Sequence, residues 1–222
     1  MAEDDRAGAY SYPHARIQVF CRAPVAGLAK TRLIPMLGES GAAALHEELA
    51  AARIRMSVGS GLAPVELWCE PSPDHPFFAR FGAQVSLHTQ VGADLGARMA
   101  AALEAGLVQA WPGQACAVLI GTDCPSLDAA YLAQALEMLK DHDAVIGPAE
   151  DGGYGLIGLR RPVPHAFRHI AWGSDRVAAE TCRVFNRERL RFALLPLLWD
   201  VDRPEDVERY RRLMRVQAGG AN

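Results

Sequence analysis

The sequence predicts a single α/β domain in which a mostly parallel central sheet carries helices on both faces. Short apolar runs, typical of buried strands, alternate with longer segments that have the residue spacing of helices. Strands joined through helices run parallel, because a connection of that length returns the chain to the same edge of the sheet. With 222 residues, 50% of them hydrophobic, the chain is long enough to bury the core of one such domain.

The first half of the chain begins this alternation. Residues 17–21 are an apolar run closed by a loop with proline and glycine, which predicts a buried first strand. Residues 39–58 are rich in Ala, Leu and Glu and predict a long helix. Two further strands are expected over 65–69 and 84–88, with a short helical piece over 77–81 between them.

The second half continues the alternation. Asp94 stands at the cap of a helix expected to run to residue 110, because its carboxylate can accept free N–H groups of the first turn. The wholly apolar run 115–120 is the clearest buried strand. The remaining expected elements are helices over 128–139, 174–186 and 204–216 and strands over 143–147, 155–159 and 191–197. The domain is expected over 16–216, with a disordered leader over 1–15 and a disordered tail over 217–222.

Composition excludes several classes of function. A net charge of -3 argues against nucleic acid or an anionic membrane as partner, because either requires a broad cationic face. The longest apolar runs fall far short of the roughly 20 residues of a membrane span, and the acidic N-terminus does not have the pattern of a secretory signal. The five cysteines are odd in number and widely spaced, which disfavours a disulfide framework or a structural zinc site. A cytoplasmic protein with reduced thiols is expected.

The loop after the first predicted strand is a candidate phosphate site. Ligands of parallel α/β sheets bind beyond the carboxyl ends of the strands. This loop holds Arg22, Lys30 and Arg32, and Gly27 lets the backbone approach a ligand. Positive charge without bulk is what an oligophosphate needs. The alternative is a solvated turn with scattered cations.

Acidic residues after two other strands are candidate metal ligands. Asp123 follows the run 115–120 directly, and a hard metal such as Mg²⁺ needs only one or two carboxylates in addition to phosphate oxygens. Asp200 and Asp202 share one side of an extended strand end, so one could complete a metal site. The alternatives are turn and cap roles, which are strong for Asp202 because Pro204 begins a helix just after it.

The turn Glu150-Asp151-Gly-Gly places two acids beside two glycines. These acids could bind an acceptor, a hydroxyl group or a metal, and the glycines permit a tight backbone. A plain hairpin turn is the alternative.

Five segments in order resemble a bacterial GT-A-like family whose members are commonly described as glycosyltransferases, some of them linked to arsenosugar biosynthesis. The resemblance covers roughly residues 16–212 and implies the nucleotide-diphospho-sugar transferase (GT-A) fold. A more distant similarity is to molybdenum-cofactor and 2-phospho-L-lactate guanylyltransferases. The segments are FCRAPVAGLAKTRLIPMLG, GADLGARM, VLIGTDCPSLDAAYL, GPAEDGGYGLIGL and DVDRPEDVERY.

The resemblance also implies roles for individual residues. The nucleotide-binding residues would be Arg22, Gly27, Lys30, Arg32, Asp94 and Gly96, with Lys30 also serving catalysis. Asp123 would hold Mg²⁺ or Mn²⁺, with Asp202 as the second carboxylate, and Asp151 would serve as a catalytic base or acceptor ligand. The first loop departs from the GxGxR core of those nucleotidyltransferases, and the DxD of many glycosyltransferases is reduced to one acid in TDC.

Three functions remain open from the sequence. The family resemblance favours glycosyl transfer from a nucleotide-sugar to a small-molecule acceptor, with Asp151 as the base. The alternative is nucleotidyl transfer from a nucleoside triphosphate to a phosphorylated acceptor with release of pyrophosphate, which the three cations of the first loop suit. A non-catalytic nucleotide-binding module is the third. The partners expected are the nucleotide and the acceptor, and a homodimer is left open.

Overall fold

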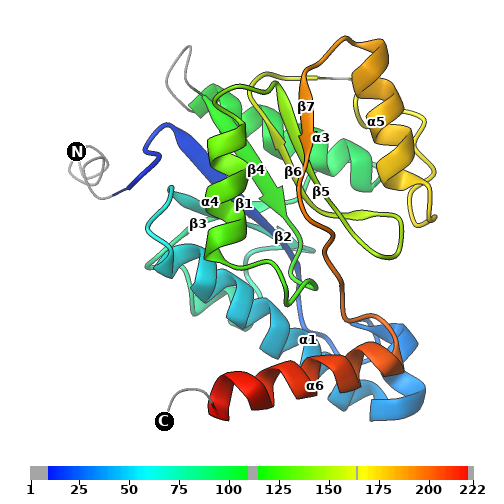
Figure 1. Cartoon of the computed structure of the whole chain (residues 1–222). Helices are drawn as coiled ribbons and strands as arrows, with labels where there is room; N and C mark the ends of the chain where they lie inside the picture. The colour runs from blue at the N-terminus through cyan, green and yellow to red at the C-terminus, as the bar shows by residue number, and fades with distance from the viewer. Residues whose placement is uncertain (1–9, 110–114, 164, 220–222) are drawn as a thin grey trace.

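A computed structural model describes residues 10–109, 115–163 and 165–219. It contains a seven-stranded sheet with the strand order β3-β2-β1-β4-β6-β5-β7 (Figure 1). The strands are β1 (Ala15–Arg22), β2 (Val65–Glu70), β3 (Ser86–Thr89), β4 (Cys116–Ile120), β5 (Ala144–Pro148), β6 (Tyr154–Leu159) and β7 (Phe192–Leu194). The helices are α1 (Ile34–Gly59), preceded by the 3-10 turn η2 (Thr31–Leu33), α2 (Pro76–Ala79), α3 (Leu95–Gln109), α4 (Ala129–Met138), α5 (Val177–Arg187) and α6 (Pro204–Gly219).

The sheet is mostly parallel, as predicted. Within it β6 alone is antiparallel, to β4 on one side and β5 on the other. The reason is the length of the connection, because the short loop between β5 and β6 can only form a hairpin, whereas the other neighbouring strands are joined by longer crossovers. This hairpin turn is the acidic, glycine-rich segment that the sequence singled out.

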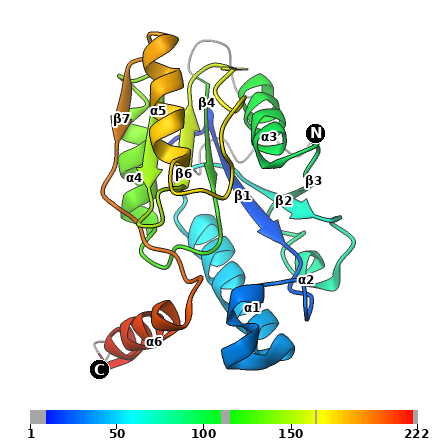
Figure 2. The ribbon, with the colours of Figure 1, turned by 90° about the vertical axis from the view of Figure 1, so that its right-hand side faces the viewer.

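Helices cover both faces of the sheet (Figure 2). The alternation along β1 sends Ile17 and Val19 into a core shared with α1 and α4. Phe20 points the other way, into a second core formed with α3 and the helix α5, which contributes Phe185. The predicted α/β class, with helices on both faces of a mostly parallel sheet, is confirmed. Within the described parts of the chain, none of the helices is both long enough and apolar enough to cross a membrane.

The last helix, α6, does not cover the sheet but packs on the first part of α1, beyond the carboxyl ends of the strands (Figure 1). Trp199, Val201 and Val207 are buried in this contact, together with Leu33. A third small core therefore fixes the chain segment between β7 and α6 at the edge where ligands of such folds bind.

Several predicted boundaries are corrected by the structure. The disordered leader predicted over 1–15 is too long. The backbone N–H groups of Ser11 and Tyr12 donate to the carbonyls of Gly61 and Leu62, and β1 begins at residue 15. Residues 1–9 and 220–222 lie outside the described residues. The helix predicted from 39 begins at Ile34, with a break at residue 38, and α6 continues through Gly219 into the predicted tail.

Two other elements are shorter than predicted. The helix expected from residue 174 begins at Val177, after a turn in which the Arg176 N–H donates to the Ser174 hydroxyl. The strand β7 ends at Leu194, although the Leu195 and Leu198 N–H groups still donate to carbonyls of β5. The chain after β7 is thus no longer a strand, but it still runs along β5 through these two hydrogen bonds.

A buried polar network joins α3 to the sheet. The Gln18 amide donates to the Glu66 carboxylate at 2.9 Å and to the Ala102 carbonyl of α3 at 2.6 Å. The Trp68 indole N–H donates to the same Glu66 oxygen at 3.0 Å. Gln18 and Glu66 are buried, so each lost bond would weaken the satisfaction of polar groups in a medium of low dielectric.

We expect Gln18→Leu to lower the free energy of unfolding by about 2–4 kcal/mol, because it removes a donor from a buried carboxylate and from a buried carbonyl. Urea denaturation followed by circular dichroism measures the change. The same substitution at the exposed Gln84 is the control and should change the free energy by less than about 0.5 kcal/mol. Equal effects at the two positions would contradict the role of the network.

Candidate active site

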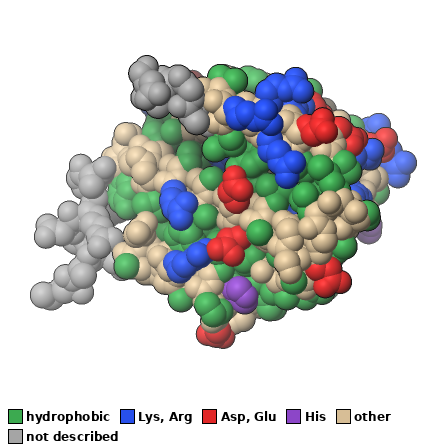
Figure 3. All heavy atoms as spheres, turned by 90° about the horizontal axis from the view of Figure 1, so that it is seen from below, with side chains coloured by type: hydrophobic (Ala, Val, Ile, Leu, Met, Phe, Trp, Pro, Cys, Tyr) green, Lys and Arg blue, Asp and Glu red, His purple; other side chains and the backbone are tan. Residues whose placement is uncertain are grey.

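The candidate site lies at the carboxyl ends of β1 and β4, where loops from four parts of the chain meet. These loops are 23–30, 121–128, 149–153 and 199–203. Seen from this side, acidic and basic side chains are interspersed over the surface instead of forming a patch of one sign (Figure 3). This arrangement suits a ligand that carries its own negative charge together with a cation.

The loop after β1 directs a lysine inward. Gly27 has φ +80° and Lys30 is left-handed at φ 49° and ψ 46°, immediately before the turn η2. A left-handed residue other than glycine is uncommon and is held by its surroundings. The Lys30 side chain is only 4% exposed, and its ammonium lies 2.9 Å from the Asp123 carboxylate oxygen Oδ2. The structure therefore brings together two residues predicted from separate motifs.

Asp123 combines a cationic neighbour with access to solvent. Its side chain is 42% exposed, so a ligand can reach it. Burial acts to raise its pKa, but the Lys30 ammonium outweighs that effect, and the pKa of Asp123 lies well below its usual value. The carboxylate is thus ionised throughout the physiological range and available as a hard oxygen ligand.

The backbone around Asp123 is held from two sides. The Val201 N–H donates to the Asp123 carbonyl at 2.9 Å, which draws the segment after β7 alongside the end of β4. On the other side, the buried Arg53 guanidinium of α1 donates to the Cys124 carbonyl at 2.7 Å. The turn that carries Asp123 is therefore rigid before any ligand binds.

The two acids after β7 have different environments. Asp202 forms an ion pair with Arg32, and the cap role weighed for it falls instead to Asp206, whose carboxylate accepts from the N–H groups of Asp202 and Arg203. Asp200 is half-buried, and burial followed by repulsion from Asp151 raises its pKa to about 6. Asp200 therefore lies among like charges, whereas Asp202 is paired with a cation.

The hairpin loop between β5 and β6 brings Asp151 near this group. Its carboxylate accepts from the Gly153 N–H at 2.9 Å, which is the turn role weighed for it. At Gly152, with φ +85°, a Cβ would lie 2.0 Å from the Asp175 carbonyl oxygen, so only glycine fits there. Glu150 points to α6 instead, where it forms a bidentate pair with Arg209 at 2.8 and 3.1 Å.

The first turn of α3 links to the end of β1 through a pair of arginines. Glu70 at the end of β2 accepts from Arg22 at 2.7 Å and from Arg98 at 2.8 Å. The hydrogen bond from Arg22 is the first cause of the lowered pKa of Glu70, and Arg98 adds to it. Arg22 therefore has an acidic partner in this structure, and Arg98 is a further cation that the sequence did not single out.

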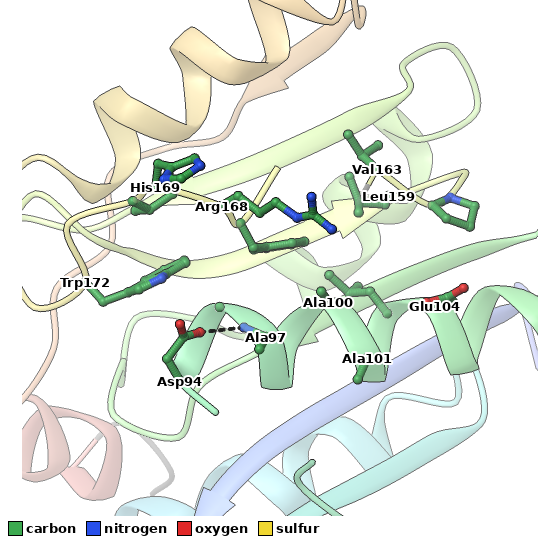
Figure 4. A pocket seen from close by; sticks show the side chains of 15 residues that line it. Asp94, Ala97, Ala100, Ala101, Glu104, Leu159, Val163, Arg168, His169 and Trp172 are labelled. Carbon is green, nitrogen blue, oxygen red and sulfur yellow. Dashed lines mark hydrogen bonds between the residues drawn. The ribbon is translucent and has the colours of Figure 1, made fainter. Parts of the chain in front are cut away.

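Asp94 caps α3 as predicted, with its carboxylate accepting from the Ala97 N–H at 2.7 Å. It stands at one end of a pocket of about 840 Å³ between α3 and the chain after β6 (Figure 4). Trp172 and His169 lie at that same end, and Glu104 lies at the other (Figure 4). A Cβ on Gly96 would lie 2.7 Å from the Trp172 ring, so this glycine serves packing.

Besides Arg98, three further contributors escaped sequence reasoning. His46 and Arg53 lie in the middle of α1, where nothing in the local sequence distinguishes them from solvated polar residues of an Ala-rich helix. Their roles arise from the packing of α1 against the loops after β1 and β4. Glu70 follows the second strand directly, and applying the rule on strand ends to it would have found it.

The donor chemistry fits a divalent cation that is shared with a nucleotide. No three His, Cys, Asp or Glu side chains of the described residues are gathered into a ready-made metal site. Asp123 and Asp200, both near Lys30, offer hard carboxylate oxygens, and Mg²⁺ in nucleotide sites needs only one or two of these besides phosphate oxygens and water. The buried His46 Nδ1, which faces Asp123, has no hydrogen-bond partner among the described residues. The residues therefore fit Mg²⁺ or Mn²⁺ bound together with phosphate.

Comparison with known proteins finds two similar at about 30% identity. The chain is 30% identical over 189 residues to the 3-phospho-D-glycerate guanylyltransferase of Phenylobacterium zucineum (strain HLK1), covering 80% of this chain and 82% of that protein. It superposes with a TM-score of 0.77 and 31% identity on a crystal structure from Desulfovibrio desulfuricans G20 described as a nucleotide-diphospho-sugar transferase. That match covers 86% of this chain and 83% of the other.

More distant structures share the fold alone. CMP:2-keto-3-deoxy-manno-octonic acid synthetase complexed with CTP matches with a TM-score of 0.58 and 12% identity, over 91% of this chain and 99% of the other. The glucosyl-3-phosphoglycerate synthase of Mycobacterium tuberculosis, in complex with Mn²⁺, UDP and glucosyl-3-phosphoglycerate, matches with a TM-score of 0.51 and 12% identity. It covers 92% of this chain and 76% of the other.

The family follows from the central part of the chain. Residues 54–174, which include Asp94, Asp123 and Asp151, match the family described as "Uncharacterized protein conserved in bacteria (DUF2064)", and the chain belongs to that family.

Proposed function

We propose that this protein is a metal-dependent nucleotidyltransferase that moves a nucleoside monophosphate from a nucleoside triphosphate, GTP in the first instance, to the phosphate of a small phosphorylated acid. The observation that carries the proposal is the buried Lys30 ammonium, 2.9 Å from the Asp123 carboxylate at the end of β4. The relative at 30% identity, a guanylyltransferase, supports this choice over glycosyl transfer, which the sequence resemblance ranked first.

In this proposal the basic residues of the site bind the triphosphate and the acidic residues bind the metal. Lys30, with Arg22 and Arg32 nearby in the same loop, would neutralise the triphosphate, and Asp123 with Asp200 would hold Mg²⁺ or Mn²⁺. When bound, the cation supplies charge stabilisation on the phosphate oxygens. An oxygen of the acceptor phosphate attacks the α-phosphorus, the bond from the α-phosphorus to the bridging oxygen breaks, and pyrophosphate leaves. Arg22 pairs with Glu70 and Arg32 with Asp202, while Lys30 pairs with Asp123 and is buried.

The acceptor chemistry also removes the need for a base. A phosphate monoester has its second pKa near 6 and is largely a dianion at neutral pH, so it attacks without losing a proton. Asp151 is then an acceptor-side residue and not the catalytic base that the family resemblance implied. Its carboxylate accepts from the Gly153 N–H and lies close enough to Asp200 to raise that residue's pKa.

The first experiment incubates the protein with Mn²⁺ or Mg²⁺, single nucleoside triphosphates or nucleotide-sugars, and phosphorylated acids including 3-phosphoglycerate. We expect metal-dependent release of pyrophosphate with a triphosphate. Asp123→Asn should reduce the rate by a factor on the order of 100 or more, because a ligand of the cation is lost. Asp141→Asn, an exposed acid far from the site, is the control. Release of a nucleoside diphosphate from a nucleotide-sugar would instead establish glycosyl transfer.

The two lysines of the chain offer a matched test of phosphate binding. Lys30→Met should raise the dissociation constant of the triphosphate about 10- to 100-fold, because it removes a charge-assisted contact of about 1.5–3 kcal/mol. Lys140→Met removes an exposed cation that pairs with Glu137 and should change binding less than about twofold. Isothermal titration calorimetry measures both, and indistinguishable constants would exclude Lys30 as a phosphate ligand.

We expect the Asp200 carboxylate to lower the free energy of unfolding of the protein, although it contributes to metal binding. Burial and repulsion from Asp151 and Asp202 oppose its ionisation, so we expect Asp200→Asn to raise the free energy of unfolding near neutral pH. The expected gain is about 1–2 kcal/mol, after allowance for solvent screening of a half-buried group. The same variant should lose metal-dependent activity. Thermal denaturation without metal measures the first effect, and a destabilised variant would show that the carboxylate is satisfied by contacts instead.

A further inference from the structure

One buried histidine touches both halves of the candidate site. His46 of α1 has a side chain only 7% exposed, and its Nε2 lies 2.9 Å from the Arg22 carbonyl oxygen. A carbonyl oxygen can only accept, so Nε2 carries the hydrogen in this contact. In the neutral ring Nδ1 is then an acceptor, and its lone pair points away from Arg22.

That acceptor faces another acceptor. Nδ1 lies 3.8 Å from the Asp123 oxygen Oδ1, beyond hydrogen-bond distance, and has no partner among the described residues. The Lys30 ammonium contacts the other carboxylate oxygen, and the Thr122 hydroxyl, 3.4 Å from Oδ1, is the other near polar group. Buried polar atoms are nearly always hydrogen-bonded. Asp123 Oδ1 accepts from the Thr122 hydroxyl, but no group of the described residues donates to His46 Nδ1, so its donor has to come from outside the chain.

We propose that His46 is a positioning residue, whose Nδ1 accepts a hydrogen bond from a water molecule on the divalent cation that Asp123 carries when nucleotide binds. This inference rests on the proposed function. Mg²⁺ and its analogues keep several waters in nucleotide sites, and each such water is a strong donor. A water displaced from the line between Nδ1 and Oδ1 can lie about 2.8 Å from both atoms.

The contact would also join the cation to the phosphate loop. Because Nε2 donates to the Arg22 carbonyl, the ring fixes the start of the loop that carries Lys30, while Nδ1 fixes the water on the cation. Partners that orient metal ligands in this indirect way typically contribute 10- to 100-fold to metal affinity. His46 does so from a rigid helix, which holds the geometry before binding.

Two substitutions separate the two ring nitrogens. His46→Gln places an amide N–H near the position of Nε2, so it keeps the bond to Arg22 and loses the acceptor facing Asp123. His46→Asn places a carbonyl oxygen near Nδ1 and does the reverse. Electron paramagnetic resonance measures Mn²⁺ affinity in the presence of a non-hydrolysable triphosphate analogue. Affinity for the analogue without metal and thermal stability are measured alongside it.

We expect His46→Gln to weaken Mn²⁺ binding about tenfold or more and His46→Asn to weaken it less than about threefold. Analogue affinity without metal should stay within about twofold for both. Equal weakening by the two variants, or a larger loss in His46→Asn, would show a purely structural role and overturn the proposal. So would strong nitrogen coupling to Mn²⁺ in the wild-type spectrum, because it would mean direct coordination. Failure of the wild-type protein to bind Mn²⁺ even with the analogue would contradict the proposed function itself.

Discussion

The ion pair between Lys30 and Asp123 is the contact on which the site depends. It joins the loop after β1 to the turn after β4. Both segments lie beyond the residues through which these two strands are paired. Because the lysine side chain is buried, loss of the carboxylate would leave an ammonium without its partner at low dielectric. The left-handed backbone at Lys30 is held by the same contact, so the loop conformation and the charge pair support each other.

The charge balance around this pair explains why a cation is needed. Asp200 lies near Asp151, Asp202 and Lys30, while Lys30 pairs with Asp123 and Arg32 pairs with Asp202. A triphosphate would add several negative charges to a group that already disfavours ionisation of Asp200. Like charges at this spacing repel strongly, so a nucleotide can enter only with compensating charge. A divalent cation shared between phosphate and carboxylates supplies that compensation, which links metal and nucleotide binding.

Sequence reasoning found the elements and the strand-end residues but not the contacts that cross between elements. The apolar runs of β1 and β4 predicted the central strands, and Lys30 and Asp123 followed from the rule on strand ends. His46 had no such signal, because its role depends on how α1 packs against two loops. The sequence could not distinguish the environments of Asp200 and Asp202 either, because alternation places both on one side. In the structure the ion pair with Arg32 distinguishes Asp202 from Asp200.

The fold alone does not choose between nucleotidyl and glycosyl transfer, because both use a cation to stabilise a leaving pyrophosphate or diphosphate. The distinction lies on the acceptor side. Glycosyl transfer to a hydroxyl group needs a base, and the nearest acid of the hairpin loop, Asp151, already accepts a backbone hydrogen bond within its own turn. An ionised phosphate acceptor needs none, but it does need cations, and the loop after β1 provides Lys30 and Arg32 beside the carboxylates. The charges of this site therefore match an anionic acceptor better than a neutral one.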